Sequence, residues 1–237
     1  MWRATELGAI SIPTVSTGFS ALDDELPGRG WPTRNLTEIL QRQSSVNEWR
    51  LLGPMLKGLV AEGGQVVLIG PPQVPHMPGL QHHGLTEKAV SWISATTASE
   101  RLWVTEQVIK ANVRGAVLAW LPQARPEQLR RLQVHAQSCD APVFLFRPID
   151  AQHNASPAPL RVLSVLGTGW QVKLHVMKRK GPVHAGWVVL SCVPGGLASV
   201  LPPRLQHLQP LAPREAQHVD MVGGLAPQRH RQPVVTF

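Results

Sequence analysis

The chain has 237 residues and a formal net charge of +8, which is enough length for one packed domain with an appendage. The charge favours an acidic partner, nucleic acid or protein, although an arginine-rich proteome would produce the same balance. No apolar run reaches the roughly 18–20 residues of a membrane span, and the N-terminus lacks an apolar signal core. The two cysteines, Cys139 and Cys192, match no metal-ligand spacing and indicate a reducing compartment. We therefore expect a cytoplasmic protein without membrane contact.

Five short apolar runs predict strands that are buried on both faces, because helices cover both sides of a parallel sheet. The runs are Leu36–Leu40, Gln65–Ile69, Ala89–Ile93, Ala116–Leu121 and Pro142–Phe146. Longer segments with apolar residues at helical spacing lie between them. This alternation predicts an α/β fold with an open, mostly parallel sheet and helices on both faces.

Three segments carry signals for the ends of helices. The apolar stripe from Leu52 to Leu59 contains Pro54, so we expect that helix to start late or to kink there. "TASE" at Thr97–Glu100 has capping-box spacing and predicts the start of another helix, with Gly115 as its stop. "PEQLRRLQVHAQS" opens on a proline, which is favoured at the first position of a helix.

The sequence changes character after Pro148. "RVLSVLGTGWQVKLHVMKRKGPVHAGWVVLSC" alternates apolar and polar residues, and its "KRKG" supplies a turn. This pattern predicts an antiparallel hairpin that extends the sheet. The chain after residue 193 is rich in Pro, Gly, Gln and His. We expect an N-terminal extension at residues 1–15, an α/β core domain at 16–193, and a Pro-rich, weakly ordered tail at 194–237.

"EILQRQSSVNEWRLL", residues 38–52, has the strand–turn–helix arrangement of a nucleotide-binding phosphate loop. Such a loop needs glycines, a lysine and a hydroxyl group, in the pattern G-x-x-x-x-G-K-[ST]. Here Asn47 stands at the lysine position and Glu48 at the hydroxyl position, where a carboxylate repels a triphosphate. The residues of this degenerate loop are Gln41, Ser44, Ser45, Val46, Asn47 and Glu48. We predict that it binds no cofactor, metal or substrate, and that Ser45 and Glu48 instead cap the next helix, with Glu48 turned to backbone N–H groups.

The segment before this loop resembles the one that leads into the phosphate loop of RecA-type recombinases. "STGFSALDDELPGRGWPTRNLTEIL" shares the TG-x-x-x-LD start, the G-x-G-x-P turn and the E-I strand end of that family. The matching residues are Thr17, Gly18, Leu22, Asp23, Gly28, Gly30, Pro32, Glu38 and Ile39. The resemblance implies that Gly70 and Pro72 replace two acidic residues of the family's ATP site, and that Trp120 replaces its metal-linked aspartate. It therefore implies a RecA-like fold that has lost nucleotide chemistry.

The chain also resembles ImuA, a RecA-like and SulA-related family of bacterial mutagenesis operons. The match covers roughly Ile12 to Cys192, and its specific parts are the segment quoted above, "EWRLLGPMLKGL", "VSWISA" and "GAVLAWLP". The resemblance implies a non-catalytic role in damage-induced (SOS), error-prone translesion DNA synthesis. The implied partner is ImuB, an inactive Y-family polymerase-like protein. An error-prone replicative-type polymerase, RecA and DNA are further candidate partners.

Other functions stay open on the sequence. A SulA-like inhibitor of the division protein FtsZ is one, although SulA-type chains are shorter and lack the long lead segment and basic tail. A DNA-binding RecA-like regulator is another, motivated by the net charge of +8. An ATPase with an unorthodox loop is disfavoured because the loop contains neither glycine nor lysine.

Two further segments are candidate contact surfaces. Spaced leucines in a proline-rich stretch are typical of a segment that docks in a partner's groove, although they could equally pack on their own domain. These residues are Leu205, Leu208, Leu211 and Arg214. The densest basic stretch could contact nucleic-acid phosphates or form a solvated hairpin tip. Its residues are Lys173, Lys178, Arg179 and Lys180.

The remaining polar clusters are expected to be structural. The three histidines of "HMPGLQHHG" lack regular metal-ligand spacing and indicate a surface loop. Glu100 and Glu106 are six residues apart and point to different sides of a helix, so paired-carboxylate catalysis is not expected. Cys139 and the pair Ser191 and Cys192 have no catalytic neighbours in the sequence and are expected in the core.

Overall fold

The structure is a computed structural model that describes residues 13–44, 47–193, 197 and 200–202. Most of the predicted N-terminal extension and most of the predicted tail lie outside these residues. Among the helices of the described part, none is long and apolar enough to cross a membrane.

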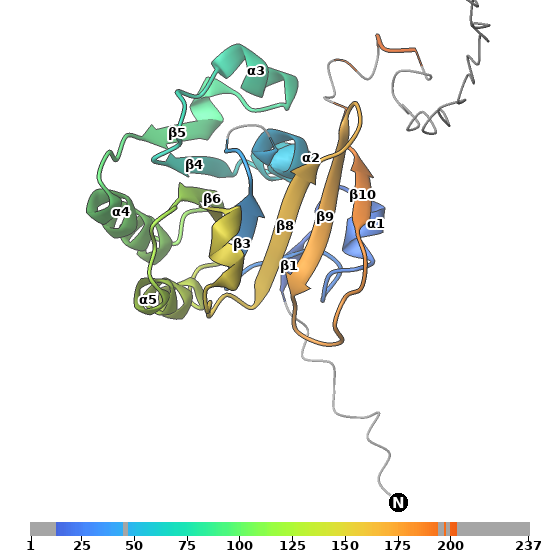
Figure 1. Cartoon of the computed structure of the whole chain (residues 1–237). Helices are drawn as coiled ribbons and strands as arrows, with labels where there is room; N and C mark the ends of the chain where they lie inside the picture. Colours follow the sequence, from blue (N-terminus) through green and yellow to red (C-terminus); the bar gives the residue numbers. More distant parts are fainter. Residues whose placement is uncertain (1–12, 45–46, 194–196, 198–199, 203–237) are drawn as a thin grey trace, which may run out of the picture.

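An open sheet of eight strands forms the centre of the molecule (Figure 1). Its strands lie in the order β10-β9-β8-β3-β7-β6-β4-β5, and all neighbours from β8 to β5 are parallel. The bounds are β3 Leu36–Gln41, β4 Gln65–Ile69, β5 Val90–Ile93, β6 Gly115–Trp120, β7 Val143–Pro148, β8 Leu160–Leu166, β9 Gln171–Lys178 and β10 Val188–Ser191. A separate antiparallel pair joins β1 (Thr14–Val15) to β2 (Trp31–Pro32). The predicted α/β class and the mostly parallel sheet are confirmed.

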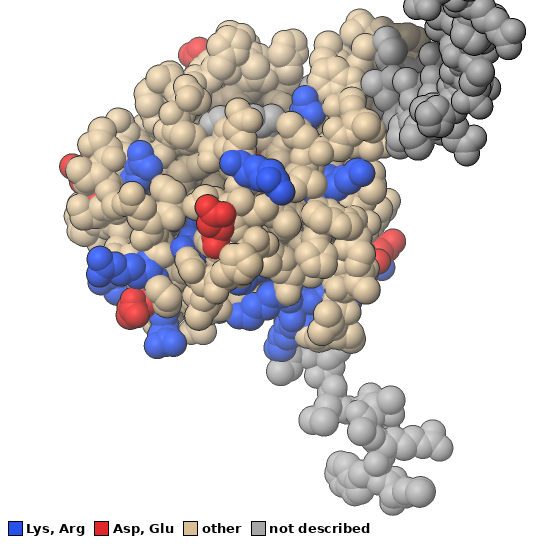
Figure 2. Space-filling view, in the orientation of Figure 1, with Lys and Arg blue, Asp and Glu red and all other residues tan. Residues whose placement is uncertain are grey.

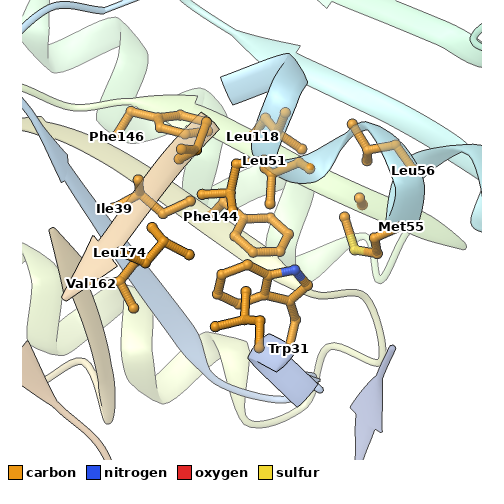
Figure 3. Packing of buried hydrophobic residues seen from close by; sticks show 14 of the residues in the cluster. Trp31, Ile39, Leu51, Met55, Leu56, Leu118, Phe144, Phe146, Val162 and Leu174 are labelled. Carbon is orange, nitrogen blue, oxygen red and sulfur yellow. The ribbon is translucent and has the colours of Figure 1, made fainter. Parts of the chain in front are cut away.

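Helices cover both faces of the parallel strands. They are α1 Ser20–Asp23, α2 Glu48–Ala61, α3 Met77–His82, α4 Ala98–Lys110 and α5 Pro126–Ala136, with 3-10 helices at Glu87–Ala89 and Ile149–His153. On one face α1 and α2 pack over a cluster that includes Trp31, Ile39, Leu51 and Phe144 (Figure 3). On the other face α4 and α5 pack over a second cluster around Leu145. The core is therefore two apolar layers separated by the sheet.

The helix starts follow the predicted signals more closely than the stops. Thr97 and Glu100 form the predicted capping box at the start of α4. That helix ends at Lys110, before the predicted stop at Gly115, because Asn112 adopts the left-handed conformation with φ +48°. The expectation of a stop at Gly115 was therefore wrong, and that glycine instead begins β6.

Pro54 lies inside α2 and does not delay its start, so of the two expected effects the late start was wrong and the kink stays a prediction. The helix begins at Glu48 and buries Leu51, Leu52 and Met55 against the sheet. A proline in a helix interior removes one backbone hydrogen bond, and here tertiary packing overrides that loss. A Cβ added to Gly18 would lie 2.4 Å from Pro54 Cβ, so the proline ring is also a close-packed contact for the preceding loop.

The antiparallel part of the sheet has three strands where the sequence predicted a hairpin of two. β8 lies parallel to β3, the turn at residues 167–170 leads into antiparallel β9, and residues 179–187 connect β9 to β10. The predicted "KRKG" turn begins that second connection, and Gly181 within it has φ +106°. The first turn was missed although "GTGW" contains Gly169 with φ +60°.

The strand predicted at Ala89–Ile93 is shorter and less buried than expected. β5 begins at Val90, after a 3-10 helix, and its residues are exposed or half-buried. Trp92 keeps 47% of its surface exposed. The prediction of burial on both faces was wrong here because β5 is the last strand at its side of the sheet and pairs with β4 alone.

Candidate functional site

The turn between β3 and α2 lies at the carboxyl edge of the parallel strands. From β3 the chain runs to α2 on one face of the sheet. From the neighbouring β7 it runs to the 3-10 helix Ile149–His153, whose Ala151 carbonyl accepts a bond from Arg161 on the other face. Ligand sites of open α/β sheets lie where connections part to opposite faces in this way. The predicted degenerate loop therefore occupies a position in which such sheets hold ligands.

Three side chains from separate elements form one buried hydrogen-bond network at this position. Gln41 Nε2 donates to Glu48 Oε1 at 2.7 Å, and Trp120 Nε1 donates to the same oxygen at 3.0 Å. All three residues are buried, and the Trp120 ring stacks on Phe146 with centroids 4.7 Å apart. The network brings together two residues of the degenerate loop and the tryptophan that the RecA resemblance aligned with a metal-linked aspartate.

Glu48 does not occupy the helix position that the predicted capping box requires. Asn47 is the N-cap residue of α2, and Glu48 is the first helical residue, whereas a capping box places its glutamate three residues after the cap. Ser45 and Val46 lie outside the described residues. The carboxylate of Glu48 accepts from the side-chain amide of Gln41 and from the indole of Trp120, and its predicted contact with backbone N–H groups stays a prediction.

The turn is also tied to the neighbouring strand. Asn47 Nδ2 donates to Ser164 Oγ on β8 at 3.2 Å, and both residues are buried. Beside this bond lies a cleft of about 320 Å³ that also contains Arg42, Gln43 and Leu166. The described lining therefore offers the amide of Gln43 and the guanidinium group of Arg42 to solvent, without the lysine that a phosphate loop needs.

A buried ion cluster lies on the opposite face of β3. Glu38 is fully buried, and its two carboxylate oxygens face Arg147 Nη1 at 2.8 Å and Arg161 Nε at 2.5 Å. Each arginine also donates to a backbone carbonyl, Arg147 to Ala124 and Arg161 to Ala151. The carboxylate therefore crosslinks β3, β7, β8 and the loops that follow β6 and β7. Sequence reasoning matched Glu38 to a strand-end motif but missed both arginines, whose only signal was a charge inside an apolar run.

The position after β4 carries no acidic side chain. Gly70 has φ +57°, and a Cβ built on it would lie 2.7 Å from Arg101 Nε, so the arginine side chain packs across the glycine. Arg101 Nε also donates to the Ala95 carbonyl at 2.8 Å. The place that the RecA resemblance assigned to a catalytic acid is therefore filled by a cationic side chain.

A cleft of about 560 Å³ lies between the starts of α4 and α5. Hydroxyl, amide and guanidinium groups line it, from Thr96, Ser99, Arg101, Gln123, Arg125 and Gln128. Both helix starts are occupied by their own caps, Glu100 on Thr97 and Gln128 on Arg125. The backbone N–H groups of Thr97 and Thr96 accordingly lower the pKa of Glu100. The backbone N–H groups of Thr97 and Arg125 are thus already partnered.

The predicted nucleic-acid residues do not form one group. Lys173 lies in the middle of β9, whereas Lys178 ends that strand and donates to the Ser156 carbonyl at 2.9 Å. Arg179 is folded back onto Glu25 at 3.5 Å and donates to the Pro182 carbonyl. Lys180 is exposed in the connection after β9. Lys173 and Lys178 are an odd number of positions apart along β9, so their side chains leave opposite faces of the sheet.

The other predicted sites have mixed outcomes. Leu205, Leu208, Leu211 and Arg214 lie outside the described residues, so their partner-binding role stays a prediction. Cys139 and Cys192 are buried thiols as expected, and burial raises the pKa of Cys192 to about 12. The expectation that Ser191 lies in the core was wrong, because it points from β10 to the exposed side of the sheet.

The histidine segment lies beside cations. His82 and His83 line a small cleft with Arg50 and Lys57, and its volume is about 200 Å³. Burial lowers the pKa of His83, and His82 and Arg50 lower it further. Among the described residues, no group of three or more His, Cys, Asp or Glu side chains is placed to hold a metal ion.

Comparison with known proteins identifies no relative. No family model matches the chain, and no curated protein matches it. The likeness to RecA-type and ImuA proteins rests on the matching residues of the lead segment and of the strands.

Proposed function

We propose that this chain is a non-catalytic accessory protein of damage-induced, error-prone translesion DNA synthesis. The segments that resemble ImuA support this function, and the sheet is compatible with a RecA-like domain. The protein acts in the cytoplasm through contacts with other proteins, foremost an ImuB-like paralogue of Y-family polymerases. An error-prone replicative-type polymerase, RecA and DNA are further proposed partners.

One observation carries the non-catalytic part of this proposal. The Gln41–Glu48–Trp120 network fills the position where the loop of a nucleotide-binding sheet would hold phosphate and metal. A triphosphate entering there would meet a carboxylate and would break two buried hydrogen bonds. Gly70 and the Arg101 side chain across it supply no acid in return. The scaffold thus supports a protein whose surface, and not its nucleotide chemistry, is functional.

Deletion of the gene tests the proposed function. We expect the deletion to lower the mutation frequency after DNA damage to the undamaged level, and the full chain supplied in trans to restore it. A second measurement separates this function from a SulA-like one. Cells that overproduce the chain are expected to survive and to assemble FtsZ normally. A damage-induced mutation frequency that is unchanged by the deletion would refute the proposal.

Titration with Mg-ATP is the second arm of this test. The full chain is expected to show no binding tighter than about 1 mM by calorimetry. Glu48→Gln is the matched control variant for this titration. It removes the negative charge that would repel a triphosphate and keeps the shape of the side chain. Micromolar binding by the unaltered chain would show that nucleotide chemistry survives, and would overturn the non-catalytic assignment.

A further inference from the structure

One face of the antiparallel strands is uncovered in the described structure. Alternate residues of β9, such as Val172 and Leu174, point into the core beneath α1 and α2. The residues between them point to the other side, where Figure 1 shows no helix in front of β8, β9 and β10. We call this the open sheet face, and its residues are Leu163, Val165, Gln171, Lys173, His175, Met177, Trp187, Val189 and Ser191. On the same side of the parallel strands, α4 and α5 form a complete helix layer.

The open sheet face is more apolar than a solvated sheet face usually is. Val165, Lys173 and Val189 lie side by side across the three strands, because each is the register partner of the next. The row beside it starts with Leu163 opposite His175, whose ring centroid lies 5.5 Å from that of Trp187. Val189 and Trp187 expose 48% and 49% of their surfaces. Antiparallel sheets with one wet face normally carry polar residues there, so these apolar rows indicate a contact surface.

The three strands of this face carry basic and no acidic residues. Residues 151–214 contain no Asp or Glu at all, whereas 13 of the 15 acidic residues precede them. Figure 2 accordingly shows blue and no red atoms over β8 and β9. Lys173 stands at the centre of the first row, between Val165 and Val189. The surface therefore combines exposed apolar residues with a positive charge among them, which complements a partner that is apolar and acidic.

Charge also distinguishes between the molecules that could occupy the open sheet face. A second copy of the chain, docked by the same face, would place Lys173 near its own equivalent and repel it. The segment 203–237 of this chain carries four arginines and only two acidic residues, so it is not complementary either. Nucleic acid would need several cations for its phosphates, whereas this face has Lys173 and an imidazole that is already bonded to the Gly186 carbonyl.

We propose that the open sheet face binds an acidic amphipathic helix of the polymerase-like partner, an inference that rests on the proposed function. The apolar residues of that helix pack on Val165, Val189 and Leu163, and an acidic residue on the same side pairs with Lys173, which stands between Val165 and Val189. Strand spacing of about 4.8 Å makes the three strands about 10 Å wide, which matches the diameter of one helix. α4 and α5 form a helix layer over the parallel strands. The bound helix extends this layer over β8, β9 and β10.

Binding of the full chain to the purified ImuB-like partner tests the proposal. Val189→Glu and Lys173→Glu are each expected to weaken the affinity at least tenfold, measured by surface plasmon resonance. Raising the salt concentration should weaken binding by the unaltered chain more than by Lys173→Glu, since that variant has lost the attractive charge. Val134→Glu on α5 and Lys88→Glu beside β5 are matched exposed controls and are expected to bind normally.

The outcomes distinguish the surface from the function. If the unaltered chain does not bind the partner, the proposed function and this surface fall together. If the unaltered chain binds and both variants bind equally well, the surface alone is wrong. If Lys173→Glu abolishes binding to single-stranded DNA while Val189→Glu leaves partner binding intact, the face is a nucleic-acid surface and the proposal is overturned. Circular dichroism confirms that each exposed substitution leaves the fold intact.

Discussion

Two buried glutamates lie on opposite sides of the same strand end and have different partners. Glu38 is held by the guanidinium groups of Arg147 and Arg161. Glu48 faces the neutral amide of Gln41 and the neutral indole of Trp120. The first carboxylate neutralises buried charge, whereas the second accepts bonds that a neutral oxygen could also accept. The comparison teaches that a glutamate's role is set by the donors that the fold brings to it.

Removing the charge of Glu38 is expected to have the largest effect. Glu38→Gln leaves two buried guanidinium groups without their counter-ion, and breaking a buried ion pair in this way costs about 3–5 kcal/mol. We expect the free energy of unfolding, measured with urea, to fall by that amount. Glu62→Gln at the exposed end of α2 is the matched control and should change it by less than about 0.5 kcal/mol.

A triple replacement sharpens this prediction. Glu38→Leu combined with Arg147→Met and Arg161→Met removes every charge of the cluster and fills the space with apolar groups. Because the desolvation of the three ions is then avoided, this variant should be more stable than Glu38→Gln. A triple variant that is less stable than the single one would contradict the view that unpaired charge, and not lost packing, dominates.

Glu48→Gln is expected to have a smaller effect than Glu38→Gln. Its amide oxygen can still accept from Gln41 and Trp120, so we expect a loss of about 1 kcal/mol in urea unfolding. Glu48→Ala leaves the amide and the indole N–H without this acceptor and should cost about 1–3 kcal/mol. Trp120 fluorescence reports the local environment in both variants. Equal destabilisation by Glu48→Gln and Glu38→Gln would abolish the proposed difference between the two sites.

The sequence predicted the strands better than the contacts of these glutamates. Mostly apolar runs locate β3, β4, β6 and β7, because burial on both faces leaves few polar residues in a strand. The same rule fails at β5, since an edge strand exposes residues such as Trp92. The partners of Glu38 lie 109 and 123 residues away in the chain, and Trp120 lies 72 residues from Glu48. Local patterns contain no information on such pairings, which only the strand order brings about.

Glu106 extends the comparison to the surface, where charge should matter least. It contacts Lys110 at 2.6 Å and Arg131 at 2.9 Å, and the hydrogen bond from Lys110, helped by the charges of Arg131, Lys110 and His135, lowers its pKa below the usual 4.5. Glu106→Gln should therefore cost only about 0–1 kcal/mol in the free energy of unfolding at neutral pH. Solvent and salt screen these contacts, unlike those of Glu38.

The stabilisation that the Glu106 carboxylate contributes is expected to depend on pH in a defined direction. A carboxylate whose pKa is lower in the folded state stabilises the protein above the unfolded pKa, and that stabilisation is lost as the pH falls through the folded pKa. The difference in unfolding free energy between the unaltered chain and Glu106→Gln should thus be constant well above the usual pKa of 4.5 and should close as the pH falls through the lower pKa of the folded state. It should also shrink in about 1 M salt, while the gap caused by Glu38→Gln persists. If salt reduced both gaps equally, burial would not be what distinguishes the two carboxylates.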